Sequence, residues 1–296
     1  MINKLIYSLL FGVFWLFASL PFPVLYLFSD FLFLVLYRLI GYRKDVVRTN
    51  LQNSFPERST KELRAIEKEF YHYLCDYFVE EIKTLRLSEA ELQQRMVYLN
   101  QEEFLRCIEQ YGGAILLIPH YANFEWIMGV GTILNEGDVP VQVYKPLRNK
   151  LFDKLFRHIR SRYGGYNVEK HATVRELVRL YRANKKMAVG LIADQNPSTN
   201  DARFWTTFLN QETVFMDGGE RIAKMLKFPV FYGDIERIQR GYCQMTFKLL
   251  AEDPKKTAEG EITEAFARHI EKTIYRNPPY WFWSHKRWKH KREEAV

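Results

Sequence analysis

The chain has 296 residues, enough for one large domain with a smaller appendage. Its formal net charge of +8 favours a polyanionic partner, such as anionic lipid, a phosphorylated substrate or nucleic acid. The three cysteines, Cys75, Cys107 and Cys243, are odd in number and scattered, so they provide neither a disulfide framework nor a metal-binding spacing. We therefore expect no metal and no cofactor.

The first 41 residues are the most apolar part of the chain. No charged residue lies between Leu5 and Ser29, and one membrane crossing needs about 20 apolar residues. Pro21-Phe22-Pro23 divides the run, and proline interrupts helices, so two shorter arms could form a re-entrant hairpin instead. Basic residues then follow the run: Arg38, Arg43, Lys44 and Arg48. By the positive-inside bias, residues 1–41 are expected to be a membrane anchor, as a single span or a hairpin, with the rest of the chain in the cytoplasm. A buried hairpin of a soluble protein is the alternative.

Residues 42–110 are expected to form a helical connector. A basic amphipathic segment covers residues 45–55, and Ser59–Leu85 has the pattern of a long helix. Ser59 or Thr60 followed by Glu62 is a capping signal at its start. A shorter helix is predicted over Ser88–Arg95.

Residues 111–296 alternate strand and helix patterns, which indicates an α/β fold. Apolar runs bounded by turn residues predict the strands Ala114–Pro119, Val139–Tyr144, Lys186–Ile192, Phe228–Asp234 and Tyr242–Leu250. The intervening stretches predict the helices Asn123–Leu134, Asn149–Arg162, Val174–Asn184, Asp217–Leu226 and Glu261–Tyr275. We therefore expect a mostly parallel sheet flanked by helices, with the core beginning near Tyr111.

The most informative motif is His120 followed by Glu125. His120 lies at the end of the predicted strand Ala114–Pro119, where open α/β sheets bind their ligands. On one continuous helix the two side chains would point roughly 140° apart, because an α-helix has 3.6 residues per turn. A strand-end histidine and a first-turn glutamate, with Asn123 as the N-cap, can instead fold back into contact. We expect Glu125 to orient the imidazole and stabilise its charged form, which makes His120 a candidate general base. A chance spacing without chemistry is the alternative.

Arginines on the predicted helix Asn149–Arg162 are candidates for phosphate binding. Phe152 and its apolar neighbours share one face of this helix, and lysines lie on the opposite face. Arg160 is at the border between the two faces, where it can reach inward beside the core. Arg160 and Arg162 could hold a phosphate because guanidinium groups bind it in a bidentate manner.

Asp194 and Gln195 follow the predicted strand Lys186–Ile192, in the same position relative to the strand as His120. Polar residues at the carboxyl end of such a strand indicate a wall of the site. A turn built by the Asp194 and Asn196 side chains explains them equally well.

The stretch 280–292 alternates aromatic and cationic side chains, in the order Tyr-Trp-Phe-Trp-Ser-His-Lys-Arg-Trp-Lys-His-Lys-Arg. Aromatic residues favour the membrane interface and basic residues favour anionic headgroups, so contact with the membrane surface is expected. Stacking on nucleic acid is the alternative. The apolar N-terminus favours the membrane, so nucleic acid is not expected as a partner.

Taken together, these blocks resemble the lipid A biosynthesis acyltransferase family, the late acyltransferases acting on lipopolysaccharide precursors, within the wider glycerophospholipid-acyltransferase-like group. His120 to Glu125 is similar to the family's His-x4-acid motif. The other similar blocks are Tyr144–Asn149 with Asp153, Arg160, Asp194–Asn196, the set Phe208, Thr213, Gly218, Arg221 and Ala223, and Tyr280–Lys289. Each motif alone is weak, but their order along most of the chain is specific. Lys145 departs from the usual arginine, and Asn196 stands where an acidic residue is common.

The resemblance implies an enzyme that moves a fatty acyl chain from an acyl carrier protein thioester to a hydroxyl of a phosphorylated lipid A precursor. It implies a cell inner-membrane protein with its catalytic domain on the cytoplasmic face. The implied catalytic residues are His120 and Glu125, and the implied substrate-binding residues are Arg160, Arg148, Asn149, Arg162, Asp194 and Gln195. An acyltransferase for a glycerolipid or aminolipid acceptor is the nearer alternative. A membrane-tethered binding protein without enzymatic activity is the remoter one.

Overall fold

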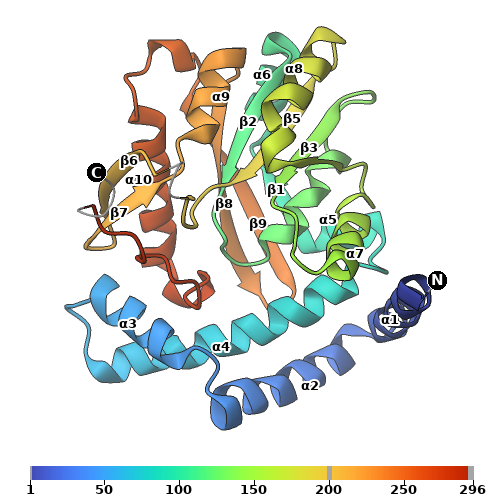
Figure 1. The fold of residues 1–296 in the computed structure, drawn as a ribbon, viewed down its shortest axis with the longest axis vertical. Helices are drawn as coiled ribbons and strands as arrows, with labels where there is room; N and C mark the ends of the chain where they lie inside the picture. The colour runs from blue at the N-terminus through green and yellow to red at the C-terminus, as the bar shows by residue number, and fades with distance from the viewer. Residues whose placement is uncertain (1, 199–201, 293–296) are drawn as a thin grey trace.

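A seven-stranded, mostly parallel sheet is the centre of the described part of the chain (Figure 1). The structure is a computed structural model and describes residues 2–198 and 202–292. The strand order is β1-β9-β8-β2-β5-β3-β4, and all neighbours are parallel except β8 and β9. The strands are β1 (Met96–Leu99), β2 (Gly113–Ile118), β3 (Val139–Tyr144), β4 (Tyr166–Glu169), β5 (Met187–Ile192), β8 (Val230–Gln239) and β9 (Tyr242–Ala251). The predicted fold class is confirmed.

Helices flank this sheet. α6 packs against β2 and β9, α9 against β2, and α10 against β8 and β9. The helices of the sheet region are α5 (Glu89–Arg95), α6 (Gln101–Tyr111), α7 (Lys150–Arg160), α8 (Thr173–Arg182), α9 (Gly218–Leu226) and α10 (Glu261–Arg276). All six residues of β2 are buried, which is why this strand reads as a continuous apolar run without alternation.

Several elements differ from those predicted from the sequence. The sheet begins at β1, before the expected start near Tyr111, because β1 pairs with β9. The short strand β4 and the hairpin of β6 (Phe204–Phe208) and β7 (Gln211–Phe215) are additional. The predicted helix Asn123–Leu134 is a 3-10 helix over Phe124–Thr132. Gly131 lies so close to a neighbouring segment that a Cβ there would meet the Tyr163 carbonyl oxygen at 2.3 Å.

The N-terminal helices before α5 are α1 (Ile2–Ala18), α2 (Phe22–Phe33), α3 (Lys44–Ser54) and α4 (Thr60–Lys83). The chain breaks before Phe22, as the prolines predict, and a π-helical stretch, Leu34–Ile40, extends α2. Phe22–Ile40 is the one stretch of the described chain that length and composition would allow to cross a membrane. α4 begins with the predicted capping box of Ser59 and Glu62. Figure 1 shows α2 lying alongside α4 below the sheet.

The aromatic C-terminal stretch is part of the core, so the predicted contact of its tryptophans with the membrane surface is wrong. Trp281 and Trp283 are 2% and 0% exposed. Tyr121 forms an antiparallel bridge with Trp281, and the N–H of Phe282 donates to the carbonyl of His120 at 3.2 Å. This segment therefore packs against the carboxyl end of β2.

We predict that Phe104→Ala lowers the free energy of unfolding by about 3–5 kcal/mol, because it leaves a cavity in a packed core. Phe104 is fully buried and stacks on Phe247 with ring centroids 4.4 Å apart. Chemical denaturation of the protein in detergent measures the change. Phe78→Ala is the matched control, because Phe78 is 41% exposed. Equal losses in the two variants would contradict this account of the core.

Candidate active site

The carboxyl ends of two adjacent strands bring His120 and Asp194 together. β2 and β5 pair in parallel with Ile118 opposite Ile192. His120 and Asp194 each lie two residues past these paired strand ends. The register of β2 and β5 therefore places the two side chains next to each other. β3 and β4 lie on one side of this pair and β8 and β9 on the other. A change of direction in strand order of this kind is where open α/β sheets bind ligands.

A hydrogen bond of 2.6 Å joins Nδ1 of His120 to Oδ1 of Asp194. Oδ2 of Asp194 accepts from the backbone N–H of His120 at 3.0 Å and from the indole N–H of Trp281 at 2.7 Å. Burial alone would raise the pKa of Asp194, but attraction to His120 and the hydrogen bonds from His120 and Trp281 bring it below the usual value. Asp194 is therefore ionised and only accepts hydrogen bonds. Nδ1 therefore donates in this hydrogen bond, which leaves Nε2 as the ring nitrogen that can meet a substrate hydroxyl.

The predicted contact between His120 and Glu125 is wrong. Glu125 forms a bidentate ion pair with Arg160, whose Nη2 and Nε donate to the two carboxylate oxygens at 2.6 and 2.9 Å. The reason is local, because Glu125 belongs to the 3-10 helix Phe124–Thr132, from which it reaches the C-terminal end of α7. The imidazole is oriented by Asp194, and Glu125 holds the arginine.

A second buried carboxyl group lies near this ion pair. Glu81 on α4 is 3% exposed, and neither of its carboxyl oxygens has a hydrogen-bond partner among the described residues. Burial and then repulsion from Glu125 raise the pKa of Glu81 well above its usual value, against the attraction of Arg160. Glu81 is thus held neutral, and the charge of Arg160 is balanced by Glu125.

The other predicted substrate-binding residues separate into two groups. Arg162 donates to the backbone carbonyl of Leu87 at 2.9 Å, and Asn149 accepts from the first N–H groups of α7, so both have structural roles. Arg148 is exposed just before α7, and Gln195 is half-buried beside Asp194. Of these four residues, only Arg148 and Gln195 are placed to meet a ligand.

The loop that contains His120 is held by hydrogen bonds to α4 and to the C-terminal segment. Ala122 has a left-handed backbone, with φ at 48°, which costs free energy in a residue other than glycine. Its carbonyl accepts from the Tyr73 hydroxyl at 2.8 Å, and its N–H donates to the Tyr280 carbonyl at 2.8 Å. Asn123 does not cap the helix that follows; its amide donates to Glu80 at 2.8 Å.

Sequence reasoning missed several supporting residues of this site. Tyr73 and Glu80 lie in a helix predicted only as a connector, and Trp281 was expected at the membrane surface. The sequence did contain a signal for these residues. Each is polar or aromatic at a position that the helix or strand pattern predicts to be buried, and such residues need a hydrogen-bond partner. His285 is a further residue that sequence reasoning missed. Burial lowers its pKa to about 4, so a second imidazole near Asp194 stays neutral.

The arrangement is that of a general base. A neutral imidazole with its proton fixed on Nδ1 by a buried carboxylate can take a proton from a hydroxyl at Nε2. The described residues contain no cluster of three or more metal-ligating side chains. The fold and the His120–Asp194 pair thus define an α/β enzyme suited to activating an alcohol for group transfer.

Comparison with known families gives this class a name. The profile of the bacterial lipid A biosynthesis acyltransferase family matches residues 1–290, nearly the whole chain, so the chain belongs to that family. The family consists of acyltransferases, and this protein is therefore an acyltransferase enzyme. A comparison with curated proteins found no significant match.

We predict that Asp194→Asn lowers kcat by roughly 10²–10⁴-fold, because an amide can hold the wrong tautomer of His120 and cannot stabilise the imidazolium. Steady-state acyl transfer measures the loss. Glu136→Gln, which replaces an exposed carboxylate by an amide in the loop before β3, is the control. Full activity of Asp194→Asn would contradict the assignment of Asp194.

Acid should reveal the depressed pKa of Asp194. The unfolded chain has an aspartate pKa of about 3.9. A lower pKa in the folded state contributes stability that is fully present above that value and is lost as the pH falls through the folded pKa. Unfolding free energies measured between about pH 2 and pH 6 should therefore fall more steeply for the wild type than for Asp194→Asn. Parallel curves would contradict the prediction.

Proposed function

We propose that this acyltransferase moves a fatty acyl chain from an acyl carrier protein thioester to a hydroxyl of a phosphorylated lipid A precursor. The observation on which the proposal rests is the free Nε2 of His120, fixed by Asp194 at the ligand-binding edge of the sheet, in a chain of this family. Residues 145 and 196, where the chain departs from the family pattern, are then expected to affect the choice of acceptor.

In the proposed reaction, Nε2 of His120 takes the proton of the acceptor hydroxyl as its oxygen attacks the thioester carbonyl. The new C–O bond forms and the C–S bond breaks. The carrier's thiolate leaves and takes the proton back from the imidazolium. Asp194 stabilises the imidazolium between these steps, and positioned base catalysis of this kind supplies roughly 10²–10⁴-fold in rate.

The acceptor's phosphate is proposed to bind at Arg160, with Arg148 as a second contact to the acceptor. Glu125 engages Nε and Nη2 of Arg160, which leaves Nη1 to meet a ligand while the ion pair fixes the guanidinium plane. Arg148 is exposed just before the other end of the same helix, so it is proposed to meet a different part of the acceptor. A pre-oriented arginine loses less conformational freedom when it binds an anion.

The donor and the location follow from charge and hydropathy. A chain with a net charge of +8 attracts an acidic carrier protein and anionic lipid. The apolar helices at the N-terminus and the basic residues that follow them support a place at the inner membrane, with the sheet on the cytoplasmic side.

Removing the base tests the proposal. His120→Ala should lower acyl transfer at least 100-fold in a purified assay with acyl carrier protein thioester. The substitution also removes a partner of the buried Asp194 and lowers the free energy of unfolding, so activity is expressed per folded enzyme. His171→Ala is the matched control, because His171 is exposed and lies in the segment that follows β4 in the sequence. Retained transfer by His120→Ala would overturn the base assignment.

Mass spectrometry of lipid A from cells with and without the protein identifies the product. Loss of one acyl chain in the cells without it would support the acceptor, and its mass would name the fatty acid. Unchanged lipid A together with altered glycerolipids or aminolipids would overturn the acceptor and leave the acyl transfer intact.

A further inference from the structure

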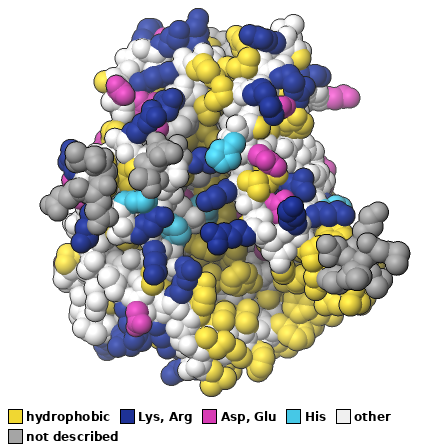
Figure 2. Space-filling view, viewed as in Figure 1, with side chains coloured by type: hydrophobic (Ala, Val, Ile, Leu, Met, Phe, Trp, Pro, Cys, Tyr) yellow, Lys and Arg dark blue, Asp and Glu magenta, His cyan; other side chains and the backbone are white. Residues whose placement is uncertain are grey.

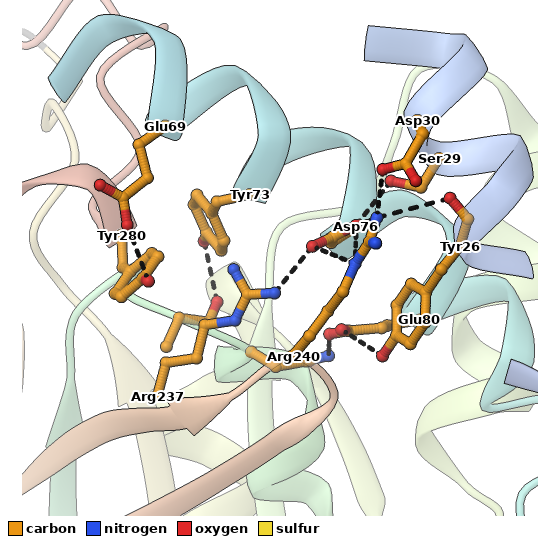
Figure 3. Close-up of polar contacts among 12 residues, drawn as sticks. Tyr26, Ser29, Asp30, Glu69, Tyr73, Asp76, Glu80, Arg237, Arg240 and Tyr280 are labelled. Atoms are coloured by element: carbon orange, nitrogen blue, oxygen red, sulfur yellow. Dashed lines mark hydrogen bonds and ion pairs between the residues drawn. The ribbon is translucent and has the colours of Figure 1, made fainter. Parts of the chain in front are cut away.

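One face of α2 is tied by polar contacts to the helix beneath the sheet. The hydroxyl of Tyr26 donates to Glu80 at 3.0 Å, and that of Ser29 donates to Asp76 at 2.6 Å. Asp30 pairs with Arg240 at 2.7 Å. Figure 3 shows these residues converging between α2, α4 and the turn that joins β8 to β9. α2 is therefore bound to the globular domain at successive turns.

The carboxylate at the centre of this cluster is well satisfied. Asp76 is 4% exposed and also accepts from Arg237 at 2.7 Å and from Arg240 at 2.5 Å. The cluster thus joins α2, α4 and the β8–β9 turn by charge-assisted hydrogen bonds, which are stronger than neutral ones, around the buried Asp76.

The opposite face of α2 is apolar and exposed. The side chains on it are Leu27 and Phe31, and the π-helical extension adds Leu34, Leu39 and Ile40; their exposed fractions lie between 51% and 79%. α1 presents a similar set, Leu9, Val13, Trp15 and Leu16. Figure 2, in the orientation of Figure 1, shows apolar side chains gathered along the edge of the molecule where α2 and α1 lie. Such an extended apolar face requires a covering.

A crossing of the bilayer by Phe22–Ile40 conflicts with these contacts. If the helix stood upright in the membrane, Ser29 and Asp30 would lie in hydrocarbon and leave Asp76 and Arg240 behind. An ionised side chain without its partner there is costly. α4 could not follow, because it contains many charged residues along its length. The contacts therefore favour a helix that stays on the domain surface.

The rim of the apolar face suits an anionic bilayer. Trp15 and Tyr42 are partly exposed at its ends, as is usual for aromatic residues at a membrane interface. Arg38, Arg43 and Arg86 are exposed beside them, and Arg86 lies over the Trp15 ring at 4.1 Å. Cations at this level meet anionic headgroups.

We infer that α1 and α2 lie in the plane of one leaflet of an anionic phospholipid bilayer, and that Phe22–Ile40 does not cross it. The exposed apolar side chains of both helices enter the acyl region to a shallow depth, because the contacts of α2 with α4 hold it against the domain surface. The polar face of α2 stays on α4.

Depth measurements on the full-length protein in vesicles of phosphatidylglycerol and phosphatidylethanolamine test this inference. A fluorescent probe is placed on Leu27→Cys, Phe31→Cys or Leu39→Cys and quenched by lipids labelled at known depths. The native cysteines are buried, and the unsubstituted protein gives the labelling background. An in-plane helix puts the three probes at similar shallow depths. A crossing helix separates the first and the last by roughly 18 Å, at 1.5 Å per residue, and that result would overturn the inference.

Substitutions on the apolar face provide a second test. Leu27→Asp with Phe31→Asp should lower partitioning into the same vesicles at least tenfold. Val174→Asp is the matched control, because Val174 is 49% exposed on α8, which Figure 1 places at the opposite end of the molecule. Unchanged partitioning of the double variant would overturn the inference. So would a change from dimer to monomer in light scattering without loss of vesicle binding, since a second copy would then cover this face.

Neither test measures acyl transfer. A failure of the membrane geometry would leave the proposed reaction standing, and a failure of the reaction would leave the geometry standing.

Discussion

The hydrogen bond between His120 and Asp194 depends on the register of β2 and β5. Because Ile118 lies opposite Ile192, the residues just past the two strand ends are neighbours. A slip of one residue would turn alternate side chains of a strand to the other face and would separate the imidazole from its carboxylate. The fully buried β2 prevents such a slip, since every one of its side chains has a packed environment. The buried core of the sheet thus sets the geometry of the base.

α4 is the second support of the site. Its Tyr73 and Glu80 hold the loop after His120, its Glu81 lies near the Glu125–Arg160 pair, and its Asp76 holds α2. One helix therefore joins the catalytic loop to the apolar helices. Its buried polar groups are costly unless they are paired, and most of them are paired with residues distant in the chain. Movement of α4 would affect both ends of this network.

Much of the fold could be predicted from the sequence, and the reasons differ by element. β2, β3, β5 and α10 have strong apolar patterns, and their predicted bounds are close to the observed ones. β1 and β4 have four residues each, too few for a pattern to appear. The 3-10 form of Phe124–Thr132 depends on close packing at Gly131, which a pattern of apolar residues does not record.

For the site, the sequence indicated that His120 lies at the end of β2 and misassigned its hydrogen-bond partner. Glu125 is near in sequence, and local reasoning preferred it. Asp194 is far away in sequence and reaches His120 only because β5 is inserted beside β2. The strand order needed for that conclusion depends on long-range packing. Arg160 was predicted at the border between two helix faces, from which it could reach inward, and it does pair with the buried Glu125. The carboxylate it would meet could not be known without the path of the 3-10 helix.

The position of Trp281 has a consequence for how the enzyme is made. Its indole completes the hydrogen bonds of Asp194, and its neighbour Phe282 pairs with the His120 backbone. A nascent chain that has left the ribosome only as far as α10 (Glu261–Arg276) contains His120 and Asp194 and still lacks this closing segment. The complete contact of His120, Asp194 and Trp281 therefore forms late in biosynthesis, after the apolar N-terminal helices have been made.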